Sequence, residues 1–198
     1  ASQPTTPINF RVPDNACDCH AHIYGDQKQF PLSPKRAYTP ETALPSEMTA
    51  LHHALHMRRV VIVHPGGPYG SDNSVTIWGM KVRGKSARGI AAIDDETSEA
   101  ELERLERIGF RGIRIDLRPV FRTDPVAARV LFEKSARRLK RLGWSLDVQA
   151  DFAVIRVMKE LFANAPVPVV VDHFATVEPK LGVEQPGFSE LLELVRQG

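Results

Sequence analysis

This sequence has few cysteines, almost no net charge and no long apolar run. Its 198 residues include two cysteines, Cys17 and Cys19, and carry a formal net charge of +2. In a strand, residues two apart point the same way along one backbone, so a bond between these thiols would be badly strained. This excludes a disulfide framework and favours a reducing compartment. We therefore expect a cytoplasmic protein, with a periplasmic one as the alternative.

These scarcities also exclude classes of partner. No apolar run approaches the roughly 18–20 residues of a membrane span, so we expect no membrane partner. A charge near neutrality argues against a nucleic-acid partner. The glycine-rich segment 66–70 lacks the Lys-Ser/Thr ending of a Walker loop, and it predicts a tight loop that lets backbone approach a ligand. A small-molecule partner remains, and the excess of Arg over Lys suits a carboxylate.

What the sequence does contain is enough apolar material for a core. Its hydrophobic fraction of 42% and its length predict one domain, at most two. Residues 1–15 are expected to form an N-terminal tail, and residues 16–198 a single domain. The start has no charged-then-apolar leader, and the absence of Met at residue 1 fits either a removed signal peptide or a trimmed initiator.

Short apolar runs alternate with longer amphipathic stretches along the chain. The runs predict strands over residues 16–22, 59–64, 89–93, 112–117, 145–149 and 167–172. The amphipathic stretches predict helices over residues 46–57, 73–82, 98–108, 125–142, 152–164 and 188–197. Ser98 and Glu101 have the spacing of a capping box, and Asp124 before Pro125 predicts a helix start. Gly109 follows a helix end, where a left-handed residue is favoured, and Gly143 does the same.

Strands separated by helices predict parallel pairing, because a parallel crossover needs about a dozen or more residues. Polar residues gather where the predicted strands end: His22, His64, Asp116, Gln149 and His173. Both (β/α)8 barrels and open doubly wound sheets place their chemistry at the carboxyl ends of strands. The sequence therefore predicts an α/β fold with a site at that edge.

The most informative motif is Asp18-Cys19-His20-Ala21-His22. Because alternate side chains of a strand share a face, we expect Asp18, His20 and His22 to point together, roughly 6.5–7 Å apart in succession. Three ionisable groups on an inward face are costly unless they have a function. Imidazoles at this spacing ligate a metal or polarise a carbonyl oxygen. The alternative is a solvated edge strand whose histidines face water.

This motif, continued through Ile23-Tyr24-Gly25, resembles the first strand of the amidohydrolase superfamily, in particular the branch of 2-pyrone-4,6-dicarboxylate lactonase. Further segments resemble that branch in chain order: residues 36–40, 70–73, 111–114, 142–144 and 171–173. The resemblance implies an α/β fold of the (β/α)8 TIM-barrel type and a role in aromatic catabolism.

The resemblance also implies site residues. By this resemblance, His20, His22 and His173 are expected to converge on a substrate carbonyl. In enzymes of that branch, a carboxylate after the eighth strand activates the attacking water. The substrate-binding residues that we expect are Tyr38, Ser71, Arg114, Arg118 and Gln149.

Arg114 shares a strand face with Asp116, and a buried arginine needs an anionic partner. That partner is expected to be either Asp116, in a purely structural pair, or the ligand.

Two positions depart from the branch. Gln149 stands where a tyrosine is expected, and Thr176 stands where an arginine is expected. Both changes remove groups that recognise a pyrone dicarboxylate, so another lactone or a monoacid is the alternative substrate. His64 and Tyr69 follow the second strand and are candidates to line the pocket instead. The helix histidines are expected to be solvated or capping residues: His52, His53 and His56.

The choice between a metal-free and a metal-dependent site remains open in the sequence. Metal-dependent members add a lysine or glutamate from the fourth strand and a histidine from the fifth. This chain has Arg114 on the fourth, and Asp147 and Gln149 on the fifth. A cation at a ligand position repels Zn²⁺, and an amide replaces imidazole poorly. We expect no cofactor. The alternative is Zn²⁺ on His20, His22 and His173.

The function that we expect is hydrolysis of a lactone ring in a small carboxylated substrate, by attack of water on the carbonyl. The alternatives within the superfamily are a Zn²⁺-dependent decarboxylase and a lactone isomerase. The non-enzymatic alternative is a small-acid binding protein on an incomplete barrel.

The length is short for the implied fold. A (β/α)8 barrel takes about 250 residues, or roughly 31 per unit, so this chain accommodates about six units. We therefore expect the last two units to be missing from the sequence, or supplied by a partner. Because unpaired edge strands are a liability for a monomer, a homo-oligomer is also expected as an alternative.

Overall fold

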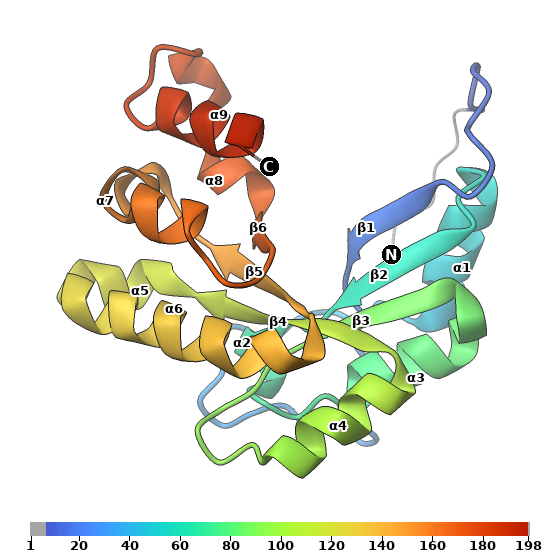
Figure 1. Ribbon diagram of the computed structural model, residues 1–198. Coiled ribbons are helices and arrows are strands. Elements are labelled where there is room, and N and C mark those ends of the chain that lie inside the picture. The colour runs from blue at the N-terminus through green and yellow to red at the C-terminus, as the bar shows by residue number, and fades with distance from the viewer. Residues whose placement is uncertain (1–6, 198) are drawn as a thin grey trace. The chain divides into compact units, whose positions relative to one another are not determined.

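The computed structural model describes residues 7–197 of the chain. Its contacts divide the chain between Arg111 and Gly112 into two compact units, which are described one at a time (Figure 1). Residues 1–6 of the predicted tail and Gly198 lie outside the described residues, so the predicted domain bounds stay a prediction. Among residues 7–197, no helix has the length and apolar composition of a membrane span.

The first unit is built on three parallel strands in chain order: β1 (Cys17–Ala21), β2 (Arg59–Val63) and β3 (Ala87–Ala91). Val60, Ile62 and Val63 of β2 are almost completely buried, as expected for a β-branched strand covered on both faces. The register between β1 and β2 shifts between Asp18 and Ala21, so β1 is irregular where its histidines begin.

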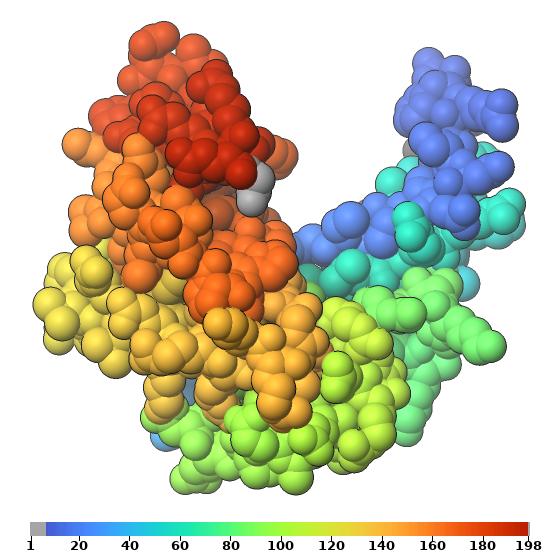
Figure 2. All heavy atoms as spheres, in the orientation of Figure 1, coloured from blue at the N-terminus to red at the C-terminus, as the bar shows by residue number. Residues whose placement is uncertain are grey.

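The helices of the first unit follow its strands. They are α1 (Pro45–Ala54), α2 (Gly66–Tyr69), α3 (Ser74–Arg83), the 3-10 turn η1 (Gly84–Ser86) and α4 (Glu99–Ile108). Helix α3 packs on β2 and β3. Within the predicted tight loop over residues 66–70, residues 66–69 form the helical turn α2 and Gly70 is its C-cap; the approach of this backbone to a ligand stays a prediction. The segment before β1, blue in Figure 2, projects from the rest of the unit, and Phe10 is largely exposed there.

The second unit contains most of β4 (Phe110–Asp116), with β5 (Ser145–Gln149) and β6 (Val169–Val171), again parallel and in chain order. In this register Arg114 of β4 lies beside Asp147 of β5. Buried Ile113, Leu146 and Val148 supply apolar contacts on the same strands.

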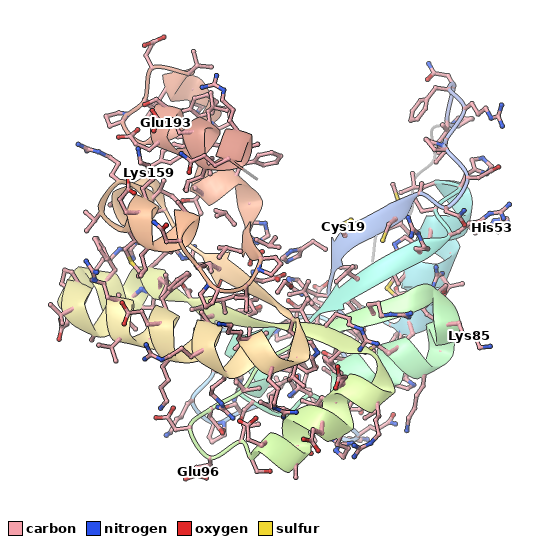
Figure 3. All side chains as sticks on the ribbon, in the orientation of Figure 1. Cys19, His53, Lys85, Glu96, Lys159 and Glu193 are labelled. Carbon is pink, nitrogen blue, oxygen red and sulfur yellow. The ribbon has the colours of Figure 1, made fainter. Side chains whose placement is uncertain are left out.

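Helices cover the strands of the second unit. They are α5 (Leu117–Thr123), α6 (Pro125–Leu139), η2 (Lys140–Leu142), α7 (Phe152–Ala163), α8 (His173–Thr176), η3 (Pro179–Leu181) and α9 (Phe188–Gln197). Helices α5 and α6 pack on each other and on β5, and α7 packs on α9. Lys159 of α7 and Glu193 of α9, labelled in Figure 3, form an ion pair on the surface.

The local signals for helix ends are confirmed. Ser98 Oγ accepts the backbone N–H of Glu101 at 3.1 Å, and Asp124 caps α6. Gly109 and Gly143 have φ values of 116° and 62°, in the left-handed region expected after a helix. The six predicted strands and six predicted long helices are all present, with ends that differ by a few residues. The predicted α/β class with parallel βα units is therefore confirmed.

Candidate functional site

In the first unit, Asp18 connects β1 to α1. Its Oδ1 accepts the backbone N–H of His20 at 3.1 Å, and its Oδ2 lies 2.9 Å from Nε2 of His52. The rings of His20 and His22 lie with centroids 5.0 Å apart in an edge-on arrangement. The ring centroids thus lie closer together than the strand repeat of about 6.5–7 Å, at a point where the register shift interrupts the regular strand. Asp18 thus supports the backbone from which the two imidazoles project.

The prediction that His52 is solvated is wrong, because its side chain is completely buried. His53 and His56 are exposed, as expected. Met48 and His52 lie four residues apart, on the same face of α1, and both are buried. That spacing was the available sequence signal, and it was outweighed by the polarity of the three neighbouring histidines.

We expect the substitution His52→Ala to lower the free energy of unfolding by about 2 kcal/mol, since it removes a buried hydrogen bond to a carboxylate. Urea unfolding measures this effect. His53→Ala is the matched control, because His53 lies on the surface in Figure 3 and its loss should cost less than about 0.5 kcal/mol. Equal losses for the two variants would show that the Asp18 contact contributes nothing to stability.

His22 follows β1 and is held by the backbone of β2. Its Nδ1 lies 2.7 Å from the carbonyl oxygen of Val63. Because a carbonyl only accepts hydrogen bonds, Nδ1 carries the proton. In the neutral ring Nε2 is then an acceptor or a metal ligand, and in the imidazolium it is a second donor.

His64 and Tyr69, which follow β2, make hydrogen bonds inside the first unit. His64 is completely buried, with Nδ1 3.1 Å from Thr76 Oγ1 and Nε2 3.0 Å from the carbonyl oxygen of Gly70. The hydroxyl of buried Tyr69 accepts the backbone N–H of Gly25 at 3.1 Å. The expectation that His64 and Tyr69 line a pocket is therefore wrong: both fix the loop that contains α2.

Two predicted substrate-binding residues of the first unit are accessible. Tyr38 is 49% exposed, and its hydroxyl lies 3.1 Å from that of Tyr24. Ser71 donates from Oγ to Asp94 Oδ2 at 2.6 Å, and this hydrogen bond is the largest cause that lowers the pKa of Asp94. Both side chains lie near loops after β1 and β2, where hydroxyl groups are available to a polar ligand.

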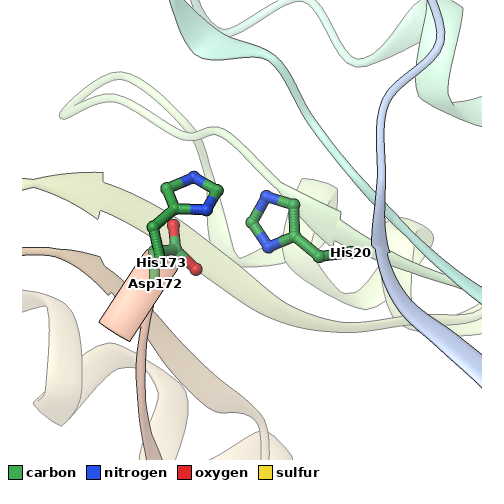
Figure 4. A group of neighbouring side chains, drawn as sticks. All are labelled: His20, Asp172 and His173. Atoms are coloured by element: carbon green, nitrogen blue, oxygen red, sulfur yellow. The ribbon is translucent and has the colours of Figure 1, made fainter. Parts of the chain in front are cut away.

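The second unit carries the densest group of buried charges. Arg114 of β4 donates from Nε to Asp172 Oδ2 at 2.7 Å, and these side chains are 11% and 1% exposed. Arg114 Nη2 also lies 3.3 Å from Nε2 of His173. Figure 4 shows the side chains of Asp172 and His173 together at the end of β6. Asp172 is the site residue that the sequence did not single out as the partner of Arg114.

Asp116 is engaged with Arg118 instead. Arg118 donates from Nε and Nη2 to the two oxygens of Asp116, at 2.9 and 2.8 Å. The hydrogen bonds from this pair raise the pKa of Arg118 above its ordinary value. The alternative of a structural Arg114–Asp116 pair is therefore wrong, because Asp116 turns to its neighbour at the start of α5. Gln149, half-buried at the end of β5, lies on the strand next to Asp116 in register.

Asp147 lies buried beneath these groups. It is 4% exposed, and its Oδ1 accepts a hydrogen bond from Ser145 Oγ at 3.0 Å. Burial raises the pKa of Asp147 from 3.8 to about 7; the nearby charge of Asp172 adds to the rise, while Ser145 and Arg114 oppose it. Two carboxyl groups thus share the neighbourhood of one guanidinium, and one of them holds its proton near neutral pH.

The turn after β6 is strained. His173, Phe174, Ala175 and Thr176 all have positive φ values, between 51° and 54°. For residues other than glycine, this left-handed backbone costs roughly 1–2 kcal/mol each. Strain of this kind persists where the surrounding structure over-determines it, and it clusters at functional sites. Here it sets the backbone from which His173 projects.

A metal at the second unit would need Asp172 and His173 as ligands. Their ligand atoms lie within 4.8 Å of one another. Arg114, however, hydrogen-bonds to Asp172 and contacts His173, so a fixed positive charge stands at both groups. Asp172 and His173 are thus possible metal ligands, and the positive charge of Arg114 weakens their attraction for Zn²⁺.

The parallel βα units and the polar side chains at the ends of their strands define an α/β protein of the (β/α)8 barrel type, with six strands among residues 7–197. The family model of the amidohydrolases matches residues 17–198. The chain belongs to the amidohydrolase family, as the sequence motifs predicted.

Individual relatives agree with this assignment. The chain is 31% identical to a 2-pyrone-4,6-dicarboxylate hydrolase of Comamonas testosteroni, over 99% of this chain and 63% of that protein. It is 32% identical to a 4-sulfomuconolactone hydrolase of Rhizobium radiobacter, over 96% of this chain and 63% of the relative. The chain thus spans under two thirds of the length of these relatives.

Solved structures agree with the fold. A probable 2-pyrone-4,6-dicarboxylic acid hydrolase from Acinetobacter baumannii with bound citric acid matches with a TM-score of 0.75 at 24% identity, over 91% of this chain and 66% of its own. An amidohydrolase from Burkholderia multivorans with bound zinc matches with a TM-score of 0.62 at 16% identity, over 93% of this chain and 66% of its own. Likeness at these identities establishes the barrel-type fold.

Proposed function

We propose that the chain carries a lactone-opening site that hydrolyses an ester bond in a small carboxylated substrate. The observation that carries this proposal is the buried Arg114 guanidinium, held by Asp172 with His173 beside it where β6 ends. A fixed cation next to an imidazole suits a substrate that joins a carboxylate to a reacting carbonyl. The two relatives named as hydrolases of carboxylated or sulfonated lactones support this substrate class.

The proposed roles follow from strand ends. His20 and His22 come from β1, and His173 follows β6; in a (β/α)8 barrel the carboxyl ends of all strands form one face. We assign these three histidines to the lactone carbonyl, where ring N–H groups stabilise the negative charge that develops on its oxygen; His22, whose Nδ1–H faces Val63, does so as an imidazolium through Nε2–H. Arg114 and Arg118 are assigned to the substrate carboxylate, and Tyr38, Ser71 and Gln149 to its remaining polar groups.

The reaction consumes one water. The water oxygen forms a bond to the carbonyl carbon, and the ring C–O bond breaks. One proton of the water passes to the ring oxygen, which becomes a hydroxyl, and the other is released to solvent when the new carboxylic acid ionises. The product is an open-chain acid with one more carboxylate than the substrate.

We expect the protein, assayed as a complete (β/α)8 barrel, to hydrolyse a carboxylated lactone, such as 2-pyrone-4,6-dicarboxylate or 4-sulfomuconolactone, and His20→Ala to lower kcat/KM about a hundredfold. The loss of one donor to a developing oxyanion has an effect of this size. Absorbance of the ring-opened product measures the rate. Cys19→Ala is the matched control, because Cys19 is exposed next to His20 on the same strand (Figure 3).

Other outcomes separate the alternatives. Tight binding of the lactone with no ring opening, in wild type and variants alike, identifies a binding protein. Stoichiometric zinc in the active protein, with activity lost on chelation, identifies a metal-dependent enzyme and contradicts the metal-free site. A rearranged lactone among the products, in place of the open acid, identifies an isomerase.

A further inference from the structure

A continuous chain of contacts in the second unit leads from a carboxylate to an imidazole. Asp172 Oδ2 accepts the Nε–H of Arg114, and Nη2 of the same guanidinium faces Nε2 of His173. Both charged side chains of the ion pair are largely buried. One planar group therefore touches Asp172 at one corner and His173 at another.

The contact between Arg114 and His173 determines which ring nitrogen carries the proton. A guanidinium has five N–H donors and no acceptor. His173 Nε2, 3.3 Å from Nη2, must therefore accept the hydrogen bond. In the neutral ring the proton is then on Nδ1.

Asp172 also fixes the backbone of His173. The N–H of Asp172 bonds to the carbonyl of Val148 on β5, and the carbonyl of Asp172 accepts the N–H of Ala175. These two hydrogen bonds anchor the left-handed turn that begins at His173. The residue thus restrains both the backbone and, through Arg114, the ring.

We propose that Asp172 is a positioning residue, which holds Arg114 so that its guanidinium keeps His173 in the Nδ1–H tautomer. The inference rests on the proposed function for its consequence: His173 presents Nδ1–H to the lactone carbonyl oxygen. Arg114 then serves two purposes at once, since it fixes an imidazole and supplies a cation for the substrate carboxylate. Asp172 acts only through these groups and does not touch the substrate.

The test reads the tautomer directly, by NMR of the imidazole nitrogens in the full chain labelled with ¹⁵N-histidine. Signals of His173 are assigned by their loss in His173→Gln. In wild type we expect the proton on Nδ1. In Asp172→Asn and in Arg114→Lys we expect a mixture of the two tautomers, and for Asp172→Asn a fall of about 10- to 100-fold in kcat.

Asp124→Asn is the control, because Asp124 caps α6 away from these residues and asparagine also caps helices. It should leave both the tautomer and kcat unchanged. A wild-type proton on Nε2, or folded Asp172→Asn and Arg114→Lys variants that both keep it on Nδ1, would overturn the positioning role. Absence of lactone hydrolysis, with the tautomers as expected, would instead overturn the proposed function alone.

Discussion

Asp147→Asn should stabilise the protein by about 3 kcal/mol at pH 8. The buried carboxyl of Asp147 has its pKa raised from 3.8 to about 7, chiefly by burial, so at pH 8 folding must hold an anion that the interior disfavours. Each unit of such a difference in pKa corresponds to about 1.4 kcal/mol. Asparagine has the same shape and still accepts the hydrogen bond from Ser145, but it carries no charge. The new amide N–H groups offset part of the gain.

The same residue gives the wild-type protein a defined pH dependence. Between pH 4 and pH 7 the folded state keeps the proton of Asp147 and the unfolded state has lost it. The stability contributed by this proton is complete below about pH 4 and is lost as the pH rises through about 7. In the asparagine variant this contribution to the slope disappears.

Urea unfolding at pH 5 and pH 8, followed by the fluorescence of buried Trp144, measures both effects. Asp151→Asn is a suitable control, since Asp151 caps α7 at the surface of the same unit. A variant that loses stability at pH 8, or keeps the wild-type slope, would show that the pKa of Asp147 is not raised in the folded protein.

The elements of the fold were predictable because their signals are local. The run Val60–Val63 and the amphipathic stretch after Asp124 contain in themselves the apolar spacing that makes a strand or a helix. Caps and left-handed glycines are equally local. Short elements were missed, such as α5, which begins directly after β4.

The partners within the candidate site were not predictable, because they depend on register between strands. From sequence, Arg114 had one acidic neighbour on its own strand face, Asp116. The structure pairs it with Asp172, 58 residues away, because β4, β5 and β6 stand side by side. The contact of His52 with Asp18 was not predictable for the same reason, since Asp18 lies 34 residues away on β1. The motifs identified which residues matter, and the register decided which of them meet.

Arg114→Met should lower the free energy of unfolding by about 3–5 kcal/mol at pH 7, which is the usual cost of removing one member of a buried ion pair. Asp172, 1% exposed, loses its counterion. Asp147 loses the neighbour that lowers its pKa, so its carboxyl becomes harder still to ionise. Because methionine fills most of the vacated volume, the loss of unfolding free energy comes more from the missing charge than from poorer packing.

The double variant Arg114→Met/Asp172→Leu separates the cost of an unpaired buried charge from the cost of lost packing. Replacing a whole buried pair by apolar residues is often neutral or stabilising, so we expect the double variant to recover most of the loss. Arg118→Met is the reference for an accessible pair, because Arg118 and Asp116 are 28% and 35% exposed, and it should cost less than about 1 kcal/mol. Urea unfolding of the wild type and the three variants measures stability, and calorimetry measures the binding of a carboxylated lactone.

If the Arg114–Asp172 pair exists for stability, the double variant stays as unstable as Arg114→Met. If it exists to hold a cation for the substrate, the double variant folds well and binds no lactone, and this is the outcome that we expect.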